Sequence, residues 1–397
     1  MKSVRLYLII GISSTVFLFV VGGFLHKPTA EKISLVFSQY AQPYSKPRCP
    51  DDRACVPKAR YLSPNELLSR PFPPDRSTNA SVPKLIHQSW SSRDLPPKFQ
   101  RWSDTWRSNH PDWEWVLWTD EDNKALVNRY FPWFGDSYQQ LRGEIFRADA
   151  ARNMYMYAFG GYSYLFQGAD CSIYADLDVE CLRPFDRLLD REITLSLSDP
   201  PSWSNESADL PPLYQKAFFG RMGHDEGFLH SIHNAWMASS PYHPFFMLPL
   251  EGIAQSINDP DADDYVEALT GPVALRDRII DYERHYRAGR NLVEYLKTTA
   301  MNKTYFEEYN LLHSLTIFPP QIIYPFSWMM TPEESTRTHC VGGGGPVLER
   351  EICKDQLKVR ENGGHCITYW THTWAPDGPN EAGIASVMDG TRKRGHG

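Results

Sequence analysis

Two acidic residues one position apart, Asp176 and Asp178, stand in the apolar run "SIYADLDVE". Side chains at i and i+2 of a β-strand point to the same face, so a strand here would direct both carboxylates toward one point. Carboxylates this close repel each other and lose hydration unless a cation joins them. Mn²⁺ and Mg²⁺ prefer oxygen ligands, and magnesium-type sites often leave several positions to substrate phosphates. The pair is therefore suited to hold a metal–diphosphate.

Other acids with the same spacing have simpler explanations. Asp120 and Asp122 follow Thr119, a helix-capping residue type, and acids in a first helical turn complement the helix dipole. The alternating acids at 259–263 lie in a polar stretch with a proline, which is typical of a turn. The apolar context, rather than the three-letter pattern, selects the pair described above.

A second candidate pair lies on the segment just before this strand. The run "EIFRADAARNMYMYAFGG" (144–161) is predicted to be a helix that stops at its glycine pair. Asp149 and Arg152 are spaced i, i+3 and share one face of that helix. An ordinary surface ion pair explains the spacing equally well. The functional interpretation places the two side chains beside the metal site, where they would hydrogen-bond the hydroxyls of a sugar.

The surrounding pattern of apolar and polar residues predicts an α/β sheet with helices on its faces, because strand-like and helix-like segments alternate. The predicted strands are 85–86, 114–120 and 172–180. The predicted helices run from the prolines at 96–97 to 109–111 and over 120–131, 144–161 and 271–286. The segment 317–328 is predicted as strand and loop, and 341–366 as a long mobile loop.

The N-terminal region predicts a membrane anchor. Residues 6–25 carry no charge and are long enough to cross a bilayer as a helix, and the basic residues in 1–5 favour a cytoplasmic tail. A cleaved signal peptide is the alternative. Both interpretations place the rest of the chain in the secretory lumen: a stem at 26–82, rich in proline, serine and charge, a globular domain at 83–376 and a C-terminal tail at 377–397.

Composition and cysteine usage agree with a lumenal protein. The formal net charge of −7 argues against a nucleic-acid partner. Glycosylation sequons begin at Asn79, Asn205 and Asn302. The seven cysteines would lie where disulfides form. Cys49 and Cys55 are close enough to close a small loop, and Cys340, Cys353 and Cys366 form a C-terminal group whose pairing the sequence leaves open.

Several segments in a fixed order resemble glycosyltransferase family 32, the group that includes the fungal initiation-specific α-1,6-mannosyltransferase and the inositolphosphoceramide mannosyltransferases. They include "PKLIHQSW", "WEWVLWTDED", "FRADAARNMYMYAFGG", "YADLDVECLRPFD" and "NAWMASSPYHPFF", and the resemblance runs from about Pro83 to Trp374. It implies a GT-A fold, one mixed α/β domain that binds a nucleotide sugar. It further implies retaining transfer of a hexose, with GDP-mannose as donor, to a glycan or glycolipid, by a single-pass type II protein of the Golgi membrane.

The resemblance also assigns roles to the candidate residues. Asp176 and Asp178 match the family's metal-binding acid pair, for Mn²⁺ or Mg²⁺. Asp149 and Arg152 match a pair that contacts the donor sugar. Trp90 matches an aromatic residue that stacks on the nucleotide base, with a core tryptophan as the alternative.

A closing motif is the loosest part of the match. The segment "YWTHTWAPDG" resembles a family segment that meets the diphosphate or the metal from the opposite side. The residues that would do so here are His372 and Trp374. A packed histidine beside a tryptophan explains the pair as well.

One segment departs from the family pattern. Removing Tyr162–Ser172 leaves "GGIYADLDVECLRP", which fits the family pattern without a gap. This stretch also contains Cys171, which makes the cysteine count odd. One hypothesis is that it is translated from non-coding sequence kept in a gene model; the other is a real loop before the strand. If the loop is real, it favours a second functional class, a non-catalytic lumenal sugar-binding relative of the same fold.

A glycoside hydrolase with an acid pair is a weaker alternative. Its two carboxylates flank the scissile bond about 5 Å or more apart and come from different elements. Two acids separated by one residue are poorly suited to that arrangement.

Overall fold

The computed structural model describes residues 57–70, 84–159, 171–198, 213–287, 292–299, 311–327, 337–340 and 347–371. The predicted anchor at 6–25, the three sequons and the tail at 377–397 lie outside these ranges. Within the ranges, no helix combines the length and the apolar character that a membrane span requires.

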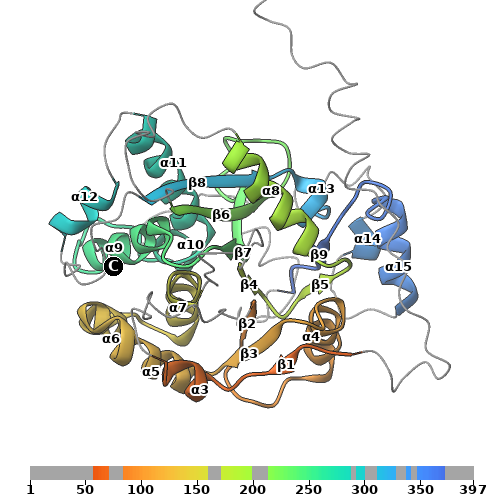
Figure 1. Cartoon of the computed structure of the whole chain (residues 1–397), viewed down its shortest axis with the longest axis horizontal. Helices are drawn as coiled ribbons and strands as arrows, with labels where there is room; N and C mark the ends of the chain where they lie inside the picture. Colours follow the sequence, from red (N-terminus) through yellow and green to blue (C-terminus); the bar gives the residue numbers. More distant parts are fainter. Residues whose placement is uncertain are drawn as a thin grey trace, which may run out of the picture.

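A mixed sheet forms the centre of the fold (Figure 1). Its strands, in spatial order, are β1 (Arg60–Tyr61), β3 (Glu114–Trp118), β2 (Leu85–Ser89), β4 (Ser172–Ala175), β7 (Ile232–Ser239), β6 (Leu213–Arg221) and β8 (Leu311–Phe318). β7 runs antiparallel to both of its neighbours, and the other pairs are parallel. A second sheet pairs β5 (Val179–Cys181) with β9 (Cys366–Thr368) in antiparallel fashion.

Helices cover both faces of the main sheet, as the sequence predicts. They are α3 (Pro64–Leu68), α4 (Pro97–Asn109), α5 (Asp120–Tyr130), α6 (Gly135–Gln140), α7 (Glu144–Ala158), α8 (Asp186–Ser198), α9 (Met247–Ser256), α10 (Val266–Leu269), α11 (Pro272–Arg287), α12 (Leu292–Thr298), α13 (Pro320–Ile323), α14 (Arg337–Cys340) and α15 (Val347–Gln356), with the short 3₁₀ helices η1 (Pro132–Phe134) and η2 (Pro244–Phe246).

The core is divided by the sheet because successive strand residues point to opposite faces. In β2, Leu85 packs into the cluster beneath α5, α7 and α9, while Ile86 packs into the cluster that contains α4 and α13. In β6, Phe219 and Phe218 divide in the same way. This two-sided burial holds the ends of the central strands in fixed positions relative to the helices.

Thr119 caps α5 as predicted. The Thr119 hydroxyl accepts from the Asp122 amide at 3.3 Å, and the Thr119 amide donates to Asp122 Oδ2 at 2.8 Å, which completes a capping box. The acids at 120–122 therefore serve the helix start, and the acids at 259–263 lie in a turn, as expected.

The prediction of one strand over 172–180 is wrong. Strand β4 ends at Ala175, residues 177–178 form a turn, and β5 begins at Val179. The Val179 amide donates to the Asp176 carbonyl at 3.1 Å and closes the turn. The chain turns here because β4 belongs to the main sheet, whereas β5 pairs with the distant β9.

The prediction of a long loop over 341–366 is also wrong. Helix α15 occupies residues 347–356, and a disulfide between Cys340 and Cys353 joins it to α14. The glycine runs on either side favoured the loop interpretation. The segment between them buries Cys353 and Lys354 against the second sheet, and this packing stabilises the helix.

Part of the predicted stem belongs to the globular domain. Residues 57–70 contain β1, which extends the sheet next to β3, and α3. Leu62 and Leu67 are buried in the core, and this apolar surface holds the segment in place. The other predicted domain boundaries stay predictions.

Candidate functional site

A cavity of about 370 Å³ opens at the carboxyl ends of β2 and β4. In α/β sheets, ligands bind outside the carboxyl ends of the strands. Its walls include the residues after β2, the turn after β4, one face of α7, the start of β7 with the residues before it, and the residues after β9. The lining includes Ser89, Trp90, Phe99, Asp120, Glu144, Asp149, Arg152, Asp176, Asp178, His230, His233, Asn234, Trp370 and Thr371.

Asp176 follows the last residue of β4 and faces this cavity. Its Oδ1 atom accepts from the Tyr174 hydroxyl at 2.6 Å and lies 3.2 Å from Arg152 Nη1. Burial raises the pKa of Asp176 to about 6; the Arg152 charge opposes this shift, and the Asp178 charge adds to it. The two acids therefore interact electrostatically although they do not share a strand.

Asp178 lies at the end of the turn and lines the same cavity. Its Oδ2 atom accepts from the Thr371 amide at 2.9 Å and from the Thr371 hydroxyl at 3.1 Å. Burial raises the pKa of Asp178, and these hydrogen bonds partly offset the effect. The turn, rather than an i, i+2 strand spacing, brings both carboxylates to the cavity.

The acid pair fits a hard divalent cation. Asp176 and Asp178 offer oxygens to one cavity, and burial disfavours their negative charges in the absence of a counterion. Within the described ranges, no group of three or more histidine, cysteine, aspartate or glutamate residues is arranged to hold a metal alone. Two carboxylates are the number of protein ligands that magnesium-type sites often use, with substrate phosphates at the remaining positions.

Asp149 and Arg152 form a buried ion pair. Arg152 Nη2 lies 2.8 Å from Asp149 Oδ1, and each side chain is only 6% exposed, so the interpretation as a surface ion pair is wrong. Burial raises the pKa of Asp149 to about 7 despite the nearby Arg152. Burial lowers the pKa of Arg152, but the charges of Asp149 and Asp176 raise it by more. The net effect is a raised pKa, so the guanidinium stays charged. Helix α7 thus brings one fixed positive charge to the acid pair.

Asn234 in β7 completes this network, and sequence reasoning assigned it no role. Its Nδ2 atom donates to Asp149 Oδ1 at 3.1 Å, and its carbonyl accepts from Arg152 Nη1 at 2.9 Å. Thr270 donates to the other oxygen of Asp149 at 3.4 Å. Asn234 begins the run "NAWMASSPYHPFF", one of the segments on which the family resemblance rests, and this position was the sequence signal for a role at the site.

Trp90 lines the cavity just after β2. Its ring centroid lies 5.0 Å from that of Phe99, and the side chain packs partly against the core. The base-stacking and core interpretations both stay open, because Trp90 packs against Phe99 and also lines the cavity.

His372 and Trp374 lie outside the described residues. The neighbouring residues Trp370 and Thr371 line the cavity instead. The C-terminal segment therefore reaches the site, through positions that the motif comparison did not select.

The segment Tyr162–Ser172 is described only at its end. Cys171 is buried, and Ser172 is the first residue of β4, where it pairs with Ser239 and donates to the Phe159 carbonyl. Residues 162–170 lie outside the described ranges. Ser172 is thus part of the sheet, and the origin of the preceding residues stays a hypothesis.

Comparisons with known proteins agree with this geometry. The family model described as "Glycosyltransferase sugar-binding region containing DXD motif" matches residues 96–194, which contain Asp149, Arg152, Asp176 and Asp178. Residues 96–194 are a glycosyltransferase sugar-binding region. The matched range contains two Asp-x-Asp sequences, at 120–122 and 176–178, and of these the second lines the cavity with both acids.

Two curated relatives come from Schizosaccharomyces pombe. "Inositol phosphoceramide mannosyltransferase 3" is 35% identical over 32% of this chain and 33% of its own length. "Initiation-specific alpha-1,6-mannosyltransferase" is 30% identical over 29% of this chain and 27% of its own length. The alignments with this chain span about a third of the length of each of these two relatives.

A solved structure titled "PaToxG Glycosyltransferase" covers 72% of this chain and 89% of its own, with 12% identity and a TM-score of 0.32. That similarity is too weak to assign a fold or a function.

Proposed function

We propose that this chain is a metal-dependent, retaining glycosyltransferase that transfers a hexose to a glycan or glycolipid acceptor. Mannose from GDP-mannose is the proposed donor, because the curated relatives are named as mannosyltransferases. The observation that carries the proposal is the cavity in which the acid pair and the buried Asp149–Arg152 pair meet. A GT-A fold, a Golgi lumenal location and an anchor at 6–25 belong to the same proposal.

The residues divide into a metal-binding group and a sugar-binding group. Asp176 and Asp178 would hold Mn²⁺ or Mg²⁺, and the ion would supply positive charge for a diphosphate leaving group. Asp149 would accept a hydrogen bond from a sugar hydroxyl at Oδ2, because Arg152 and Asn234 occupy Oδ1 and hold the carboxylate in place. Trp90 would stack on the nucleotide base.

The proposed retention comes from the resemblance to glycosyltransferase family 32, and a same-face attack would account for it. Positive charge develops on the anomeric carbon in an oxocarbenium-like state. The acceptor hydroxyl would attack from the face that the diphosphate leaves and give its proton to a phosphate oxygen. This route needs no covalent carboxylate nucleophile, and we assign none.

The test is metal-dependent turnover by the purified full chain in detergent. A panel of nucleotide sugars with Mn²⁺ should give hydrolysis of GDP-mannose, and linkage analysis with candidate acceptors should give an α-linked product. Asp178→Asn should abolish turnover, since the amide loses the charge that holds the ion. Asp264→Asn is the matched control, because that carboxylate is exposed and pairs with Arg142 on the surface.

The alternative is a non-catalytic sugar-binding relative, which the residues preceding β4 favour. Such a protein would bind GDP-mannose with Mn²⁺ and show no turnover with any donor in the panel. Binding without turnover would therefore replace the proposed activity with this alternative.

A further inference from the structure

The residues that follow β9 approach the acid pair from a separate part of the fold. Thr371 is buried, and both its amide and its hydroxyl donate to Asp178 Oδ2, at 2.9 and 3.1 Å. A carboxylate oxygen has two lone pairs, so these two donors occupy that oxygen. The Oδ1 atom is then the oxygen that Asp178 can offer to a cation.

Trp370 directs the chain into this position. Its φ of +51° lies in the left-handed region, which costs a bulky residue roughly 1–3 kcal/mol and persists only where the surroundings hold it. The indole nitrogen donates to the Phe326 carbonyl at 3.0 Å. The centroid of the Trp370 ring lies 4.5 Å from that of His233 and 5.5 Å from that of Tyr324. These contacts fix Trp370, and with it the amide of Thr371.

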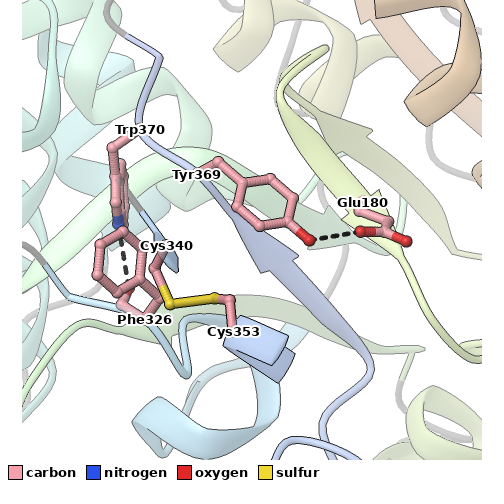
Figure 2. Close-up of a disulfide and its surroundings, with 6 residues drawn as sticks. All are labelled: Glu180, Phe326, Cys340, Cys353, Tyr369 and Trp370. Carbon is pink, nitrogen blue, oxygen red and sulfur yellow. Dashed lines mark hydrogen bonds between the residues drawn. A yellow bond between two sulfur atoms is a disulfide. The ribbon is translucent and has the colours of Figure 1, made fainter. Parts of the chain in front are cut away.

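Tyr369 ties the same segment to the disulfide region. Figure 2 shows Tyr369 reaching toward Glu180 of β5 while Trp370 extends over Phe326. The Tyr369 hydroxyl donates to Glu180 Oε2 at 2.6 Å, and the buried Lys354 of α15 donates to Oε1 at 2.9 Å. The next residue toward the N-terminus of α15 is Cys353, which forms the disulfide with Cys340.

We propose that Thr371 is a positioning residue that holds the Asp178 carboxylate ready for a divalent cation, and that Glu180 and the disulfide-joined α15 hold the Thr371 segment in place. This inference rests on the proposed function, because it needs the metal site. It goes further by assigning a role to a residue outside the matched region 96–194.

The expected effect is a loss of metal affinity. Hydrogen-bond partners of metal ligands typically contribute 10–100-fold to metal affinity, because they orient the ligand before the ion binds. Thr371→Val keeps the side-chain volume and the amide but removes the hydroxyl donor. We expect roughly 10-fold weaker Mn²⁺ binding for this variant. Thr371→Ser keeps the hydroxyl and should bind Mn²⁺ nearly as the wild type does.

The experiment is a calorimetric titration of Mn²⁺ into the full chain in the presence of GDP. Thr298→Val is the matched control, since the exposed Thr298 hydroxyl donates to the Tyr295 carbonyl of its own helix. Weaker binding in Thr371→Val, with recovery in Thr371→Ser and no change in Thr298→Val, supports the inference. Equal Mn²⁺ affinity in Thr371→Val and the wild type overturns it, whatever the turnover.

Two further outcomes separate this inference from the proposed function. If the wild type binds no Mn²⁺, the metal site itself is wrong and both proposals fail. If the wild type binds Mn²⁺ but Thr371→Val does not, circular dichroism shows whether Thr371→Val is folded. If Thr371→Val is unfolded, Thr371→Ala takes its place in the comparison with Thr371→Ser. Equal Mn²⁺ affinity of Thr371→Ala and Thr371→Ser then overturns the inference.

Discussion

Nη1 of Arg152 lies 3.2 Å from Oδ1 of Asp176, so helix α7 is connected directly to the first acid of the pair. The same guanidinium contacts Asp149 through its other terminal nitrogen. Arg152 also lies over the ring of Tyr174, 4.7 Å from its centroid. One planar side chain with several donors thus serves two carboxylates and an aromatic ring, a geometry that lysine cannot reproduce.

Arg152→Met is expected to destabilise the fold strongly. Removing the cation leaves the buried Asp149 without its partner and the partly exposed Asp176 without one of its contacts, and breaking a buried ion pair typically costs about 3–5 kcal/mol. Arg152→Lys restores a charge but not the two-sided contact, and should recover stability only in part. Urea unfolding measures both variants. A methionine variant as stable as the wild type would show that this network contributes little.

Burial raises the pKa of Asp149 to about 7 in the folded protein, above its value in the unfolded chain. The free energy of unfolding therefore depends on pH through this group. Between about pH 4 and pH 7 the folded state then binds more protons at this group than the unfolded state does. The contribution of Asp149 to the free energy of unfolding therefore falls as the pH rises through this window. Asp149→Asn lacks this titration.

The measurement is the free energy of unfolding of metal-free Asp149→Asn minus that of the wild type, by urea at several pH values. This difference should increase from pH 4 to pH 7 and then level off. A difference that decreases over the same window would mean that the Arg152 ion pair outweighs burial and lowers the pKa of Asp149.

Local elements were predictable where their determinants are adjacent in sequence. The Thr119 capping box lies within four residues, and the proline at the start of α4 and Asn109 at its end are local signals. The position of Asp149 and Arg152 on one helical face followed from spacing alone. Their burial did not, because it depends on β7 and on Thr270.

The wrong strand prediction at 172–180 has a long-range cause. Apolar residues on both sides of the acids continue the strand pattern, and nothing in that pattern indicates which sheet each half joins. Glu180 pairs with Ile367 of β9, so the end of β4 and the start of β5 depend on residues far along the chain. The roles of Thr371 and Asn234 escaped prediction for the same reason, since their hydrogen bonds span 193 and 85 positions.

Asn234→Ala is predicted to weaken donor binding more than metal binding. The substitution removes the Nδ2 donor to Asp149 and leaves that buried carboxylate with one fewer hydrogen bond, a loss of about 1–3 kcal/mol. The KM for GDP-mannose should rise roughly 10-fold, while Mn²⁺ affinity with GDP stays within experimental error. An unchanged KM would show that the hydrogen bond from Asn234 to Asp149 does not support donor binding.

The Cys340–Cys353 disulfide is predicted to stabilise the C-terminal region. The bond joins residues 13 positions apart, and closing a loop of this size contributes roughly 3 kcal/mol in the chain-entropy account. A Cys340→Ala/Cys353→Ala double variant should therefore melt roughly 5–10 °C below the wild type. Differential scanning calorimetry without reductant makes the comparison.

The same variant tests how the disulfide is connected to the site. Loosening α15 weakens the support that Lys354 gives to Glu180 and Tyr369, so Mn²⁺ affinity should fall, though by less than in Thr371→Val because both Thr371 donors remain. Glu180→Gln should act in the same direction, since it removes the charge that pairs with Lys354. A double variant that melts lower but binds Mn²⁺ as the wild type does would confine the disulfide to a structural role and leave Trp370 and the Tyr369–Glu180 hydrogen bond as the supports of Thr371.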